Sequence, residues 1–454
     1  MITQQQQDEA DTQEIRLAVV LNGGVSLAVW ISGVTLELHR LVQASRARGT
    51  GRSASPYAGL LDLLHARARI DVIAGTSAGG LNGGFLALGL VHGCDLAPMR
   101  DMWEADGDLA TLLRDPREKA APSLLRGGHF HERVAAAYRT ISAARTGHAA
   151  VDEPVELFLT GTLWEGRRSG YTDDRGRRIT EVDYDATFRF SSDGPGGGVG
   201  DLRSATVGDE LAVASRCTSS FPGAFEPWWV EVDGAVGDRF ASTAGQANFE
   251  RSQYVVDGGV LRNKPVRPAL DAVYRQKAGP QVRRVMAYVV PDPGERAQEP
   301  APEAATGPVP HASDVLLGVL TRLRSTDSVS RELSEVQARN DEARGRRRTR
   351  DRLAQALTSS ALESPSAGVD LPAAAFPAYR EVRAEHAARS LPRLVLSGCG
   401  PVQRRWSPRE LGSVLRELAV EPGLPFIPAG SLESALDAPP PHWHWGQSAV
   451  ARLG

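Results

Sequence analysis

The stretch RIDVIAGTSAGGLNGGFLAL, residues 69–88, limits most strongly what this chain can fold into. An apolar run from Ile70 to Ala74 meets Gly75-Thr76-Ser77-Ala78-Gly79, and a glycine-dotted helical pattern follows. A strand that turns at glycines into a helix is the unit from which parallel sheets with crossover helices are built. The segment therefore predicts a buried strand, a tight turn at Ser77 and a helix packed on the sheet.

The same order of elements occurs once before it. IRLAVVLNGG is a short apolar strand that ends in glycines, and VSLAVWISGVTLELHRLVQASRA has the pattern of a helix. Further along, PVELFLTGTLWEG and RITEVDYDATFRF alternate in polarity around the turn-rich RRSGYTDDRG, which predicts a hairpin. YVVDGGVLRNKPV and RRVMAYVVPDP each contain one more strand. The pattern predicts an α/β fold.

Shifts in composition divide the chain of 454 residues into four parts. Residues 1–14 are polar and glutamine-rich, and we expect them to be disordered. Residues 15–293 form the α/β domain, and residues 294–311 are a proline- and alanine-rich linker. Residues 312–454 begin with a long helical pattern dense in charge, so we expect a mainly helical C-terminal region of unknown role.

Composition excludes several classes of protein. The formal net charge of −3 gives no basic footprint for nucleic acid. Three widely spaced cysteines, Cys94, Cys217 and Cys399, form neither a disulfide framework nor a metal-ligand pattern. The polar N-terminus lacks the apolar core of a signal peptide, and no run approaches the roughly 20 apolar residues of a membrane span. We expect a cytoplasmic protein without metal or cofactor that contacts membranes only peripherally; its oligomeric state stays open.

Ser77 is the candidate nucleophile. A serine in a tight strand-to-helix turn needs small neighbours, which Gly75 and Gly79 supply, and its Oγ then lies at the carboxyl end of the strand. The N-terminus of the following helix favours developing negative charge there. The alternative is a phosphate-binding or purely structural glycine turn.

A serine that attacks an ester also needs donors for the oxyanion. Asn22-Gly23-Gly24 follows the first strand and precedes a helix, so backbone amides from Gly23 to Val25 are candidates. The alternative is a nucleotide or phosphate loop. The spacing is not G-x-G-x-x-G, however, and no Gly-Lys-Ser/Thr follows.

The candidate base is Asp257 rather than a histidine. None of the ten histidines lies in a glycine turn after a strand, whereas an apolar strand delivers Asp257 into the turn formed by Gly258 and Gly259. A carboxylate is a weak base for an alcohol, so it must be desolvated and in direct contact with the Ser77 Oγ. The alternative is that Asp257 only caps its turn.

Taken in order, Asn22-Gly23-Gly24, Gly75 to Gly79 and Asp257-Gly258-Gly259 resemble the motifs of the patatin-like phospholipase family, and ASRCTSSFPGAFEP, residues 214–227, resembles its segment before the aspartate strand. The resemblance covers residues 15–293. It implies a three-layer α/β/α core with a mostly parallel central sheet, and a metal-independent lipid acyl hydrolase. It also implies that Ser77 and Asp257 form a dyad without histidine, with Gly23, Gly24 and Val25 as the oxyanion hole.

The chain departs from the family pattern in its first loop. Leu27 and Ala28 stand where many members carry arginine and glycine, so a guanidinium contact with substrate is missing there. This loop, with the helical part after the core, resembles a bacterial patatin-related subfamily that has an additional C-terminal domain.

Two other functions stay open at this stage. One is an α/β-hydrolase with a Ser-Asp-His triad, in which a late histidine such as His442 would be the base. The other is an inactive scaffold that binds a partner through its C-terminal helices. Substitution of His442 and His444 separates dyad from triad, and covalent labelling of Ser77 by a fluorophosphonate separates enzyme from scaffold.

Two further segments have surface interpretations. Phe221, Phe225, Trp228 and Trp229 form either a lip that meets lipid or part of the core. The basic run ARGRRRTR, residues 343–350, either meets an anionic membrane or is a solvated helix face.

Overall fold

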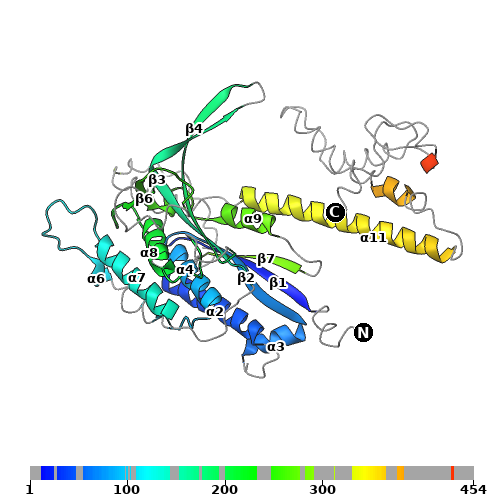
Figure 1. Cartoon of the computed structure of the whole chain (residues 1–454), viewed down its shortest axis with the longest axis horizontal. Coiled ribbons are helices and arrows are strands. Elements are labelled where there is room, and N and C mark those ends of the chain that lie inside the picture. Colours follow the sequence, from blue (N-terminus) through cyan, green and yellow to red (C-terminus); the bar gives the residue numbers. More distant parts are fainter. Residues whose placement is uncertain are drawn as a thin grey trace. The chain divides into compact units, whose positions relative to one another are not determined.

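The structure is a computed structural model of the chain (Figure 1). It describes residues 12–24, 28–47, 55–97, 99–100, 103, 109–143, 153–172, 176–193, 200–232, 247–276, 282–290, 311, 330–363, 376–382 and 431–433. The chain divides between Val329 and Ser330 into two compact units, and each is described by itself.

The first unit alternates strands and helices in its N-terminal part. Its elements are β1 (Gln13–Leu21), α2 (Ala28–Arg46), α3 (Pro56–Leu63), β2 (Ala66–Gly75), α4 (Ala78–His92), α6 (Leu109–Leu112), α7 (Gly127–Ala143), β3 (Glu156–Thr172), β4 (Arg178–Ser191), α8 (Val207–Thr218), β5 (Trp228–Val230), β6 (Gln253–Asp257), the 3-10 turn η3 (Gly258–Val260), α9 (Val266–Arg275) and β7 (Val282–Val289).

These strands form one sheet in the order β5-β6-β3-β2-β1-β7, with β4 paired to β3. Strands β7, β1, β2 and β3 run parallel. β4 and β6 pair antiparallel with β3, and β5 pairs antiparallel with β6. The predicted hairpin is β3–β4, which extends beyond the rest of the sheet in Figure 1. Its first strand is longer than predicted because part of the turn-rich stretch also pairs, from Arg167 opposite Asp183 to Thr172 opposite Arg178.

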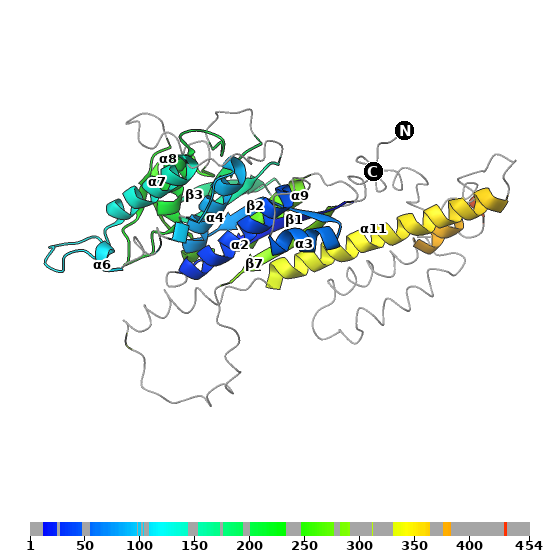
Figure 2. The ribbon, with the colours of Figure 1, turned by 90° about the horizontal axis from the view of Figure 1, so that it is seen from below.

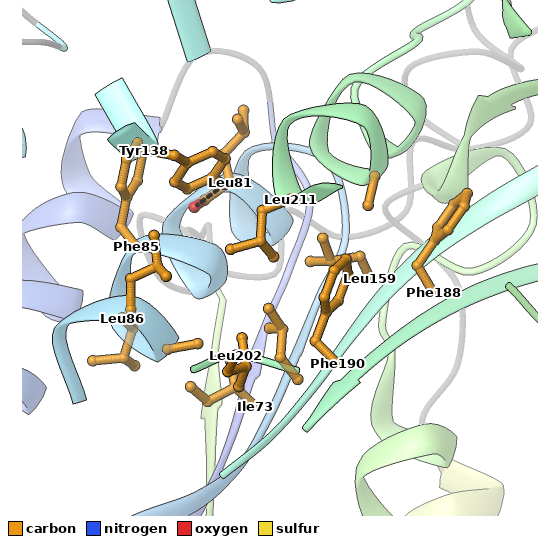
Figure 3. Packing of buried hydrophobic residues seen from close by; sticks show 14 of the residues in the cluster. Ile73, Leu81, Phe85, Leu86, Tyr138, Leu159, Phe188, Phe190, Leu202 and Leu211 are labelled. Atoms are coloured by element: carbon orange, nitrogen blue, oxygen red, sulfur yellow. Dashed lines mark hydrogen bonds between the residues drawn. The ribbon is translucent and has the colours of Figure 1, made fainter. Parts of the chain in front are cut away.

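Helices cover both faces of the sheet. Helix α4 packs against α2, α7 and α8 and over β1, β2 and β3, whereas α9 packs on the same three strands and buries Val266, Ala269 and Leu270. Figure 2 shows α2 and α4 beside the sheet, and Figure 3 shows Leu81, Phe85 and Leu86 of the core cluster. The predicted three-layer α/β/α core with a mostly parallel central sheet is confirmed.

Helix α4 is buried along its whole length because glycines let other elements approach it closely. A Cβ atom on Gly83 would lie 3.1 Å from Ile73 Cγ2, and one on Gly80 would lie 2.8 Å from Thr218 Cγ2. The Tyr138 hydroxyl reaches over Gly84 to donate to the Leu81 carbonyl at 3.1 Å. Phe85 and Leu86 are fully buried in this cluster, so they belong to the core.

The first strand begins two residues before the predicted start of the α/β domain at residue 15. β1 begins at Gln13, so Gln13 and Glu14 belong to the sheet and not to a disordered tail. Glu14 is held there by arginines, with its carboxylate 2.9 Å from Arg16 and 3.0 Å from Arg69. The polarity of this segment suggested a tail. The pairing of β1 with β2, which brings Arg69 to Glu14, cannot be seen in the local sequence. Residues 1–11 lie outside the described residues.

The second unit contains α11 (Ser330–Glu363), which confirms a helix in the charged C-terminal pattern. The basic run 343–350 lies on it, and Arg344 and Arg346 pair with Asp341 and Glu342 on the same helix. This part of the run has the contacts of a solvated helix face. Residues 312–329 lie outside the described residues, and the predicted domain boundaries stay predictions.

Candidate active site

Ser77 lies in the tight turn between β2 and α4, where the sequence predicts one. Its backbone has φ 54° and ψ −128°, a conformation that costs free energy for any residue with a side chain. Gly79 makes the turn feasible, because a Cβ atom there would overlap the Leu21 carbonyl oxygen and lie 2.5 Å from that of Asn22. The turn thus presses β1, β2 and α4 together around Ser77.

The first amides of α4 surround the serine. The Gly79 amide donates to the Thr76 carbonyl at 2.9 Å, and the Gly80 and Leu81 amides donate to the Ser77 carbonyl at 2.8 and 3.1 Å. Among the described residues the Ala78 amide has no such acceptor. It is therefore a donor that the sequence motifs do not single out, and it directly follows Ser77 at the N-terminus of α4.

Asp257 ends β6 and is fully buried. Its Oδ1 accepts a hydrogen bond of 2.6 Å from the Gly259 amide, so it caps its own turn, as the alternative reading of the sequence expects. The turn packs tightly on β3, because a Cβ atom on Gly258 would overlap Thr160. Capping fixes the carboxylate at the end of β6 and does not compete with a role as a base.

One short segment at the end of α8, residues 218–220, is bonded to both of these turns. Thr218 Oγ1 accepts a hydrogen bond of 2.8 Å from the Ser77 amide, and the Ser220 carbonyl accepts one of 3.0 Å from the Asp257 amide. Both bonds are buried. The segment 218–220 therefore sets the distance and orientation between the backbones of the two candidate residues.

Arg216 holds that segment in place from a fully buried position. Its guanidinium donates to the Gly127 carbonyl at 3.1 Å, to Ser220 Oγ at 2.6 Å and to the Glu226 carbonyl at 2.9 Å. Burial lowers the pKa of Arg216, and the Glu226 carboxylate, 3.5 Å away, opposes that shift. A fixed cation thus connects α8 to the loop that leads into β5.

The same guanidinium also bears on whether the aromatic residues of segment 221–229 form a lip for lipid or part of the core. It lies 5.0 Å from the ring centroids of both Phe225 and Trp228. Phe225 is buried and Trp228 is partly buried, so these two belong to the core and not to an exposed lip. Trp229, by contrast, is 41% exposed.

A second set of contacts joins the turn of β2 to the loop after β6. Thr76 Oγ1 lies 2.6 Å from Thr160 Oγ1 and donates to the Arg262 carbonyl at 3.0 Å. Arg262 in turn pairs with Asp185 of β4 at 3.1 Å. Burial raises the pKa of Asp185, and Arg262 opposes that shift. The loop after Asp257 is thereby fixed against the residue that precedes Ser77.

The glycine loop after β1 completes the arrangement. A Cβ atom on Gly23 would lie 3.1 Å from Ser77 Cβ, so this loop touches the turn that carries Ser77. The Gly23 amide donates to the Asn263 carbonyl at 3.4 Å, and the Asn22 amide donates to that of Val289 at 3.1 Å. Gly24 is half-buried beside them, while Val25 lies outside the described residues. All three sequence motifs therefore meet at one edge of the sheet.

The described histidines do not complete a triad with Ser77 by these contacts. His92 is bonded to the Leu202 carbonyl at the far end of α4, about 20 Å along the helix from Ser77. His39 is buried and bonded to Gln43 at 3.2 Å. His442 and His444 lie outside the described residues. Across the described part of the chain, no cluster of three or more His, Cys, Asp or Glu could hold a metal ion.

Sequence reasoning missed four residues that hold the site together: Thr76, Thr160, Thr218 and Asn263. Their contacts link segments more than a hundred residues apart, except at Thr76 and Thr160, which are 84 apart. Only the segment 214–227 carried a signal, since it was singled out for its resemblance. Spacing along the chain gives no other indication of such contacts.

Comparison with known proteins agrees with this geometry. The family model described as "Patatin-like phospholipase" matches residues 19–270, more than half of the chain. The chain is also 35% identical over 378 residues to "Uncharacterized membrane protein Rv3479" of Mycobacterium tuberculosis, an alignment that covers 76% of this chain and 34% of that protein. It therefore spans about a third of the length of that relative. Within the described residues, no helix has both the length and the apolar character needed to cross a bilayer. The chain belongs to the patatin-like phospholipase family, a family of lipid acyl hydrolases.

Proposed function

We propose that the chain is a serine lipid acyl hydrolase of the phospholipase A type that uses Ser77 and Asp257 as a catalytic dyad. One observation supports the proposal most strongly. The buried segment 218–220 accepts hydrogen bonds from the backbone amides of both Ser77 and Asp257. A structural glycine turn does not need a partner that also fixes a buried carboxylate. A dyad does, because proton transfer requires the two side chains in hydrogen-bond reach.

The reaction follows from the roles of these groups. Asp257 takes the proton from Ser77 Oγ as the oxygen attacks the ester carbonyl carbon. The tetrahedral intermediate collapses with loss of the alkoxide, which takes the proton back from Asp257 and leaves as the alcohol. Water then attacks the acyl-serine in the same way, and the fatty acid and free Ser77 are released. Each step transfers one proton to or from Asp257.

The oxyanion of both intermediates needs amide donors at the carboxyl edge. The predicted donors are the amides of Gly23, Gly24 and Val25. Because the Gly23 amide already donates to Asn263, we assign the role first to Gly24 and Val25. We add the Ala78 amide, at the start of α4, as a partner from the nucleophile turn. Loss of one such donor typically costs about a hundredfold to a thousandfold in rate.

We further propose that this enzyme works on lipid in membranes as a peripheral protein. The name of the relative describes that protein as a membrane protein. Among the described residues of this chain, no helix could span a bilayer. A cytoplasmic location stays a prediction.

The test is hydrolysis of a series of p-nitrophenyl acyl esters and of a mixed phospholipid pool. We expect Ser77→Ala and Asp257→Asn to lose about a thousandfold or more of the rate, with the variant in which His442 and His444 are both alanine close to wild type. Loss of activity in the histidine variant would instead establish a triad. No turnover on any substrate, together with no fluorophosphonate adduct on Ser77, would identify a scaffold.

A further inference from the structure

Three exposed aromatic side chains lie in a row across three neighbouring strands. Trp229 of β5 pairs with Tyr254 of β6, and Leu163 of β3 pairs with Val255, which places Trp164 beside Tyr254. Trp164 is 64% exposed, Tyr254 47% and Trp229 41%. The rings of Trp229 and Tyr254 lie edge to face with centroids 5.0 Å apart. We call these three residues the aromatic face.

These rings are exposed although the opposite face of the same strands is packed in the core. The alternate residues of the same strands, Leu163 and Val255, are fully buried on the other side of the sheet. Alternation therefore directs the three rings outward, over a groove of about 620 Å³ that Pro122 and Pro227 also line. Large apolar groups gathered on one exposed face commonly mark a surface that meets lipid or protein.

The aromatic face lies on the same edge of the molecule as the candidate active site. β3 and β6 continue past the carboxyl end of β2, because Gly75 is opposite Leu159 while Asp257 is opposite Gly161. Tyr254 precedes Asp257 by three residues, which is about 10 Å along a strand. Strand alternation turns Tyr254 away from the side to which Asp257 points. The face therefore adjoins the site without lining it.

The groove beneath the face carries a paired charge among its described lining residues. Its ionic side chain, Glu226, pairs with Arg114 at 3.4 Å and with Arg216 at 3.5 Å. Tryptophan and tyrosine are also the residues that concentrate at the interface of a bilayer, where a ring can be half in hydrocarbon and half in water. Such a face matches zwitterionic lipid better than an anionic surface.

We propose that the aromatic face docks the protein on the interfacial region of a zwitterionic bilayer and so brings the edge that carries Ser77 to its substrate. This inference rests on the proposed function, since only a lipid hydrolase needs its active edge held at a membrane. It also differs from docking through the basic run 343–350, which would depend on anionic lipid and on salt.

The test is co-sedimentation of the full chain with phosphatidylcholine vesicles at low and high salt. All proteins carry Ser77→Ala, so that no lipid is consumed. We expect the Ser77→Ala protein with an unchanged aromatic face to bind the vesicles at both salt concentrations. Substitution of Trp164, Tyr254 and Trp229 by alanine should lower the apparent affinity by about tenfold or more. Tryptophan quenching by brominated acyl chains should fall in parallel.

A matched control comes from the other end of the sheet. Leu60 and Leu63 of α3 are 55% and 77% exposed, and α3 leads into the amino end of β2. Leu60→Ala/Leu63→Ala should bind vesicles as the parent does. Thermal unfolding of each variant, and of the single variant Trp164→Ala, separates lost docking from lost folding.

Three results would overturn the proposal: equal vesicle binding by the triple variant, binding that requires anionic lipid and disappears at high salt, or burial of the face in a dimer in solution. Hydrolysis of a short soluble ester by the Ser77 enzyme is measured separately. If that reaction fails while the vesicle result holds, the proposed function is wrong and the docking surface remains.

Discussion

Two fully buried aspartates lie in the central sheet and are held in different ways. Asp71 is the extra residue of a bulge in β2, and its carboxylate pairs with Arg284 at 2.6 Å and Arg69 at 3.7 Å. Asp257 ends β6, and its Oδ1 accepts the Gly259 amide at 2.6 Å. Burial raises the pKa of Asp71, and the guanidinium groups of Arg284 and Arg69 oppose that shift, whereas a neutral amide positions Asp257. Only the second arrangement suits a group that must take and return a proton.

The largest expected effect is a difference in kcat between variants of these two aspartates. Asp257→Asn should lower kcat by about a thousandfold or more, because an amide cannot take the serine proton. Asp71→Asn should keep kcat within about threefold, since its contacts lie away from the site, and it should lose stability because Arg284 loses its carboxylate partner. Ester hydrolysis and urea unfolding of both variants check this. Equal losses of kcat would remove the distinction.

The next largest effect compares the two arginines that serve these regions. Arg216 is fully buried and supports the segment 218–220, while Arg284 supports Asp71. Removing one partner of a buried ionic network typically costs about 3–5 kcal/mol. We expect both Arg216→Met and Arg284→Met to lower the free energy of unfolding, Arg216→Met by about that amount. Only Arg216→Met should also lower kcat per folded molecule, as measured by active-site titration.

The two turns that carry Ser77 and Asp257 could be predicted from the sequence, but the contacts that join them could not. The turns at Ser77 and Asp257 are local, because each needs only an apolar strand and adjacent glycines. The site that joins them depends on Thr218 and Ser220, which reach the two turns through packing of α8. Arg216 has the spacing of an ordinary helix residue, and nothing in the sequence marks it as buried. Pairing of β1 with β2 likewise explains why Glu14 belongs to the sheet.

A smaller effect concerns pH at the end of α4 that lies away from Ser77. His39 is buried, and this lowers its pKa to about 4, with a bond to the Gly89 backbone opposing the shift. The folded state therefore binds the proton more weakly than the unfolded state, so stability is lost as pH falls through the interval between the two pKa values. We expect a loss of about 3 kcal/mol between about pH 7 and pH 4.

Urea unfolding of wild type and His39→Gln across that interval checks the prediction. The variant should lack this part of the pH dependence, and other acids should account for the remainder. An unchanged slope in His39→Gln would mean that His39 does not set acid stability. The pH profile of activity, which we propose depends on Asp257, should keep its shape in this variant.

The smallest effects are changes in stability on substitution of two glycines, one with close neighbours and one without. A Cβ atom on Gly79 would meet the carbonyl oxygens of Leu21 and Asn22, whereas one on Gly33 of α2 would meet no atom within 4 Å. We expect Gly79→Ala to cost about 1–3 kcal/mol, since backbone must move. Gly33→Ala should gain about 0.5–1 kcal/mol from helix propensity. Thermal unfolding measures both.

Activity makes the glycine comparison sharper, because the carbonyl groups that Gly79 touches belong to the loop beside Ser77. Gly79→Ala should push that loop away and lower kcat more than its loss of stability alone would explain. Gly33→Ala is its matched control, with kcat at the wild-type value. If Gly79→Ala kept full activity, close packing of the first loop on the nucleophile turn would not be needed for catalysis. The oxyanion donors would then have to come from the Ala78 side of the turn.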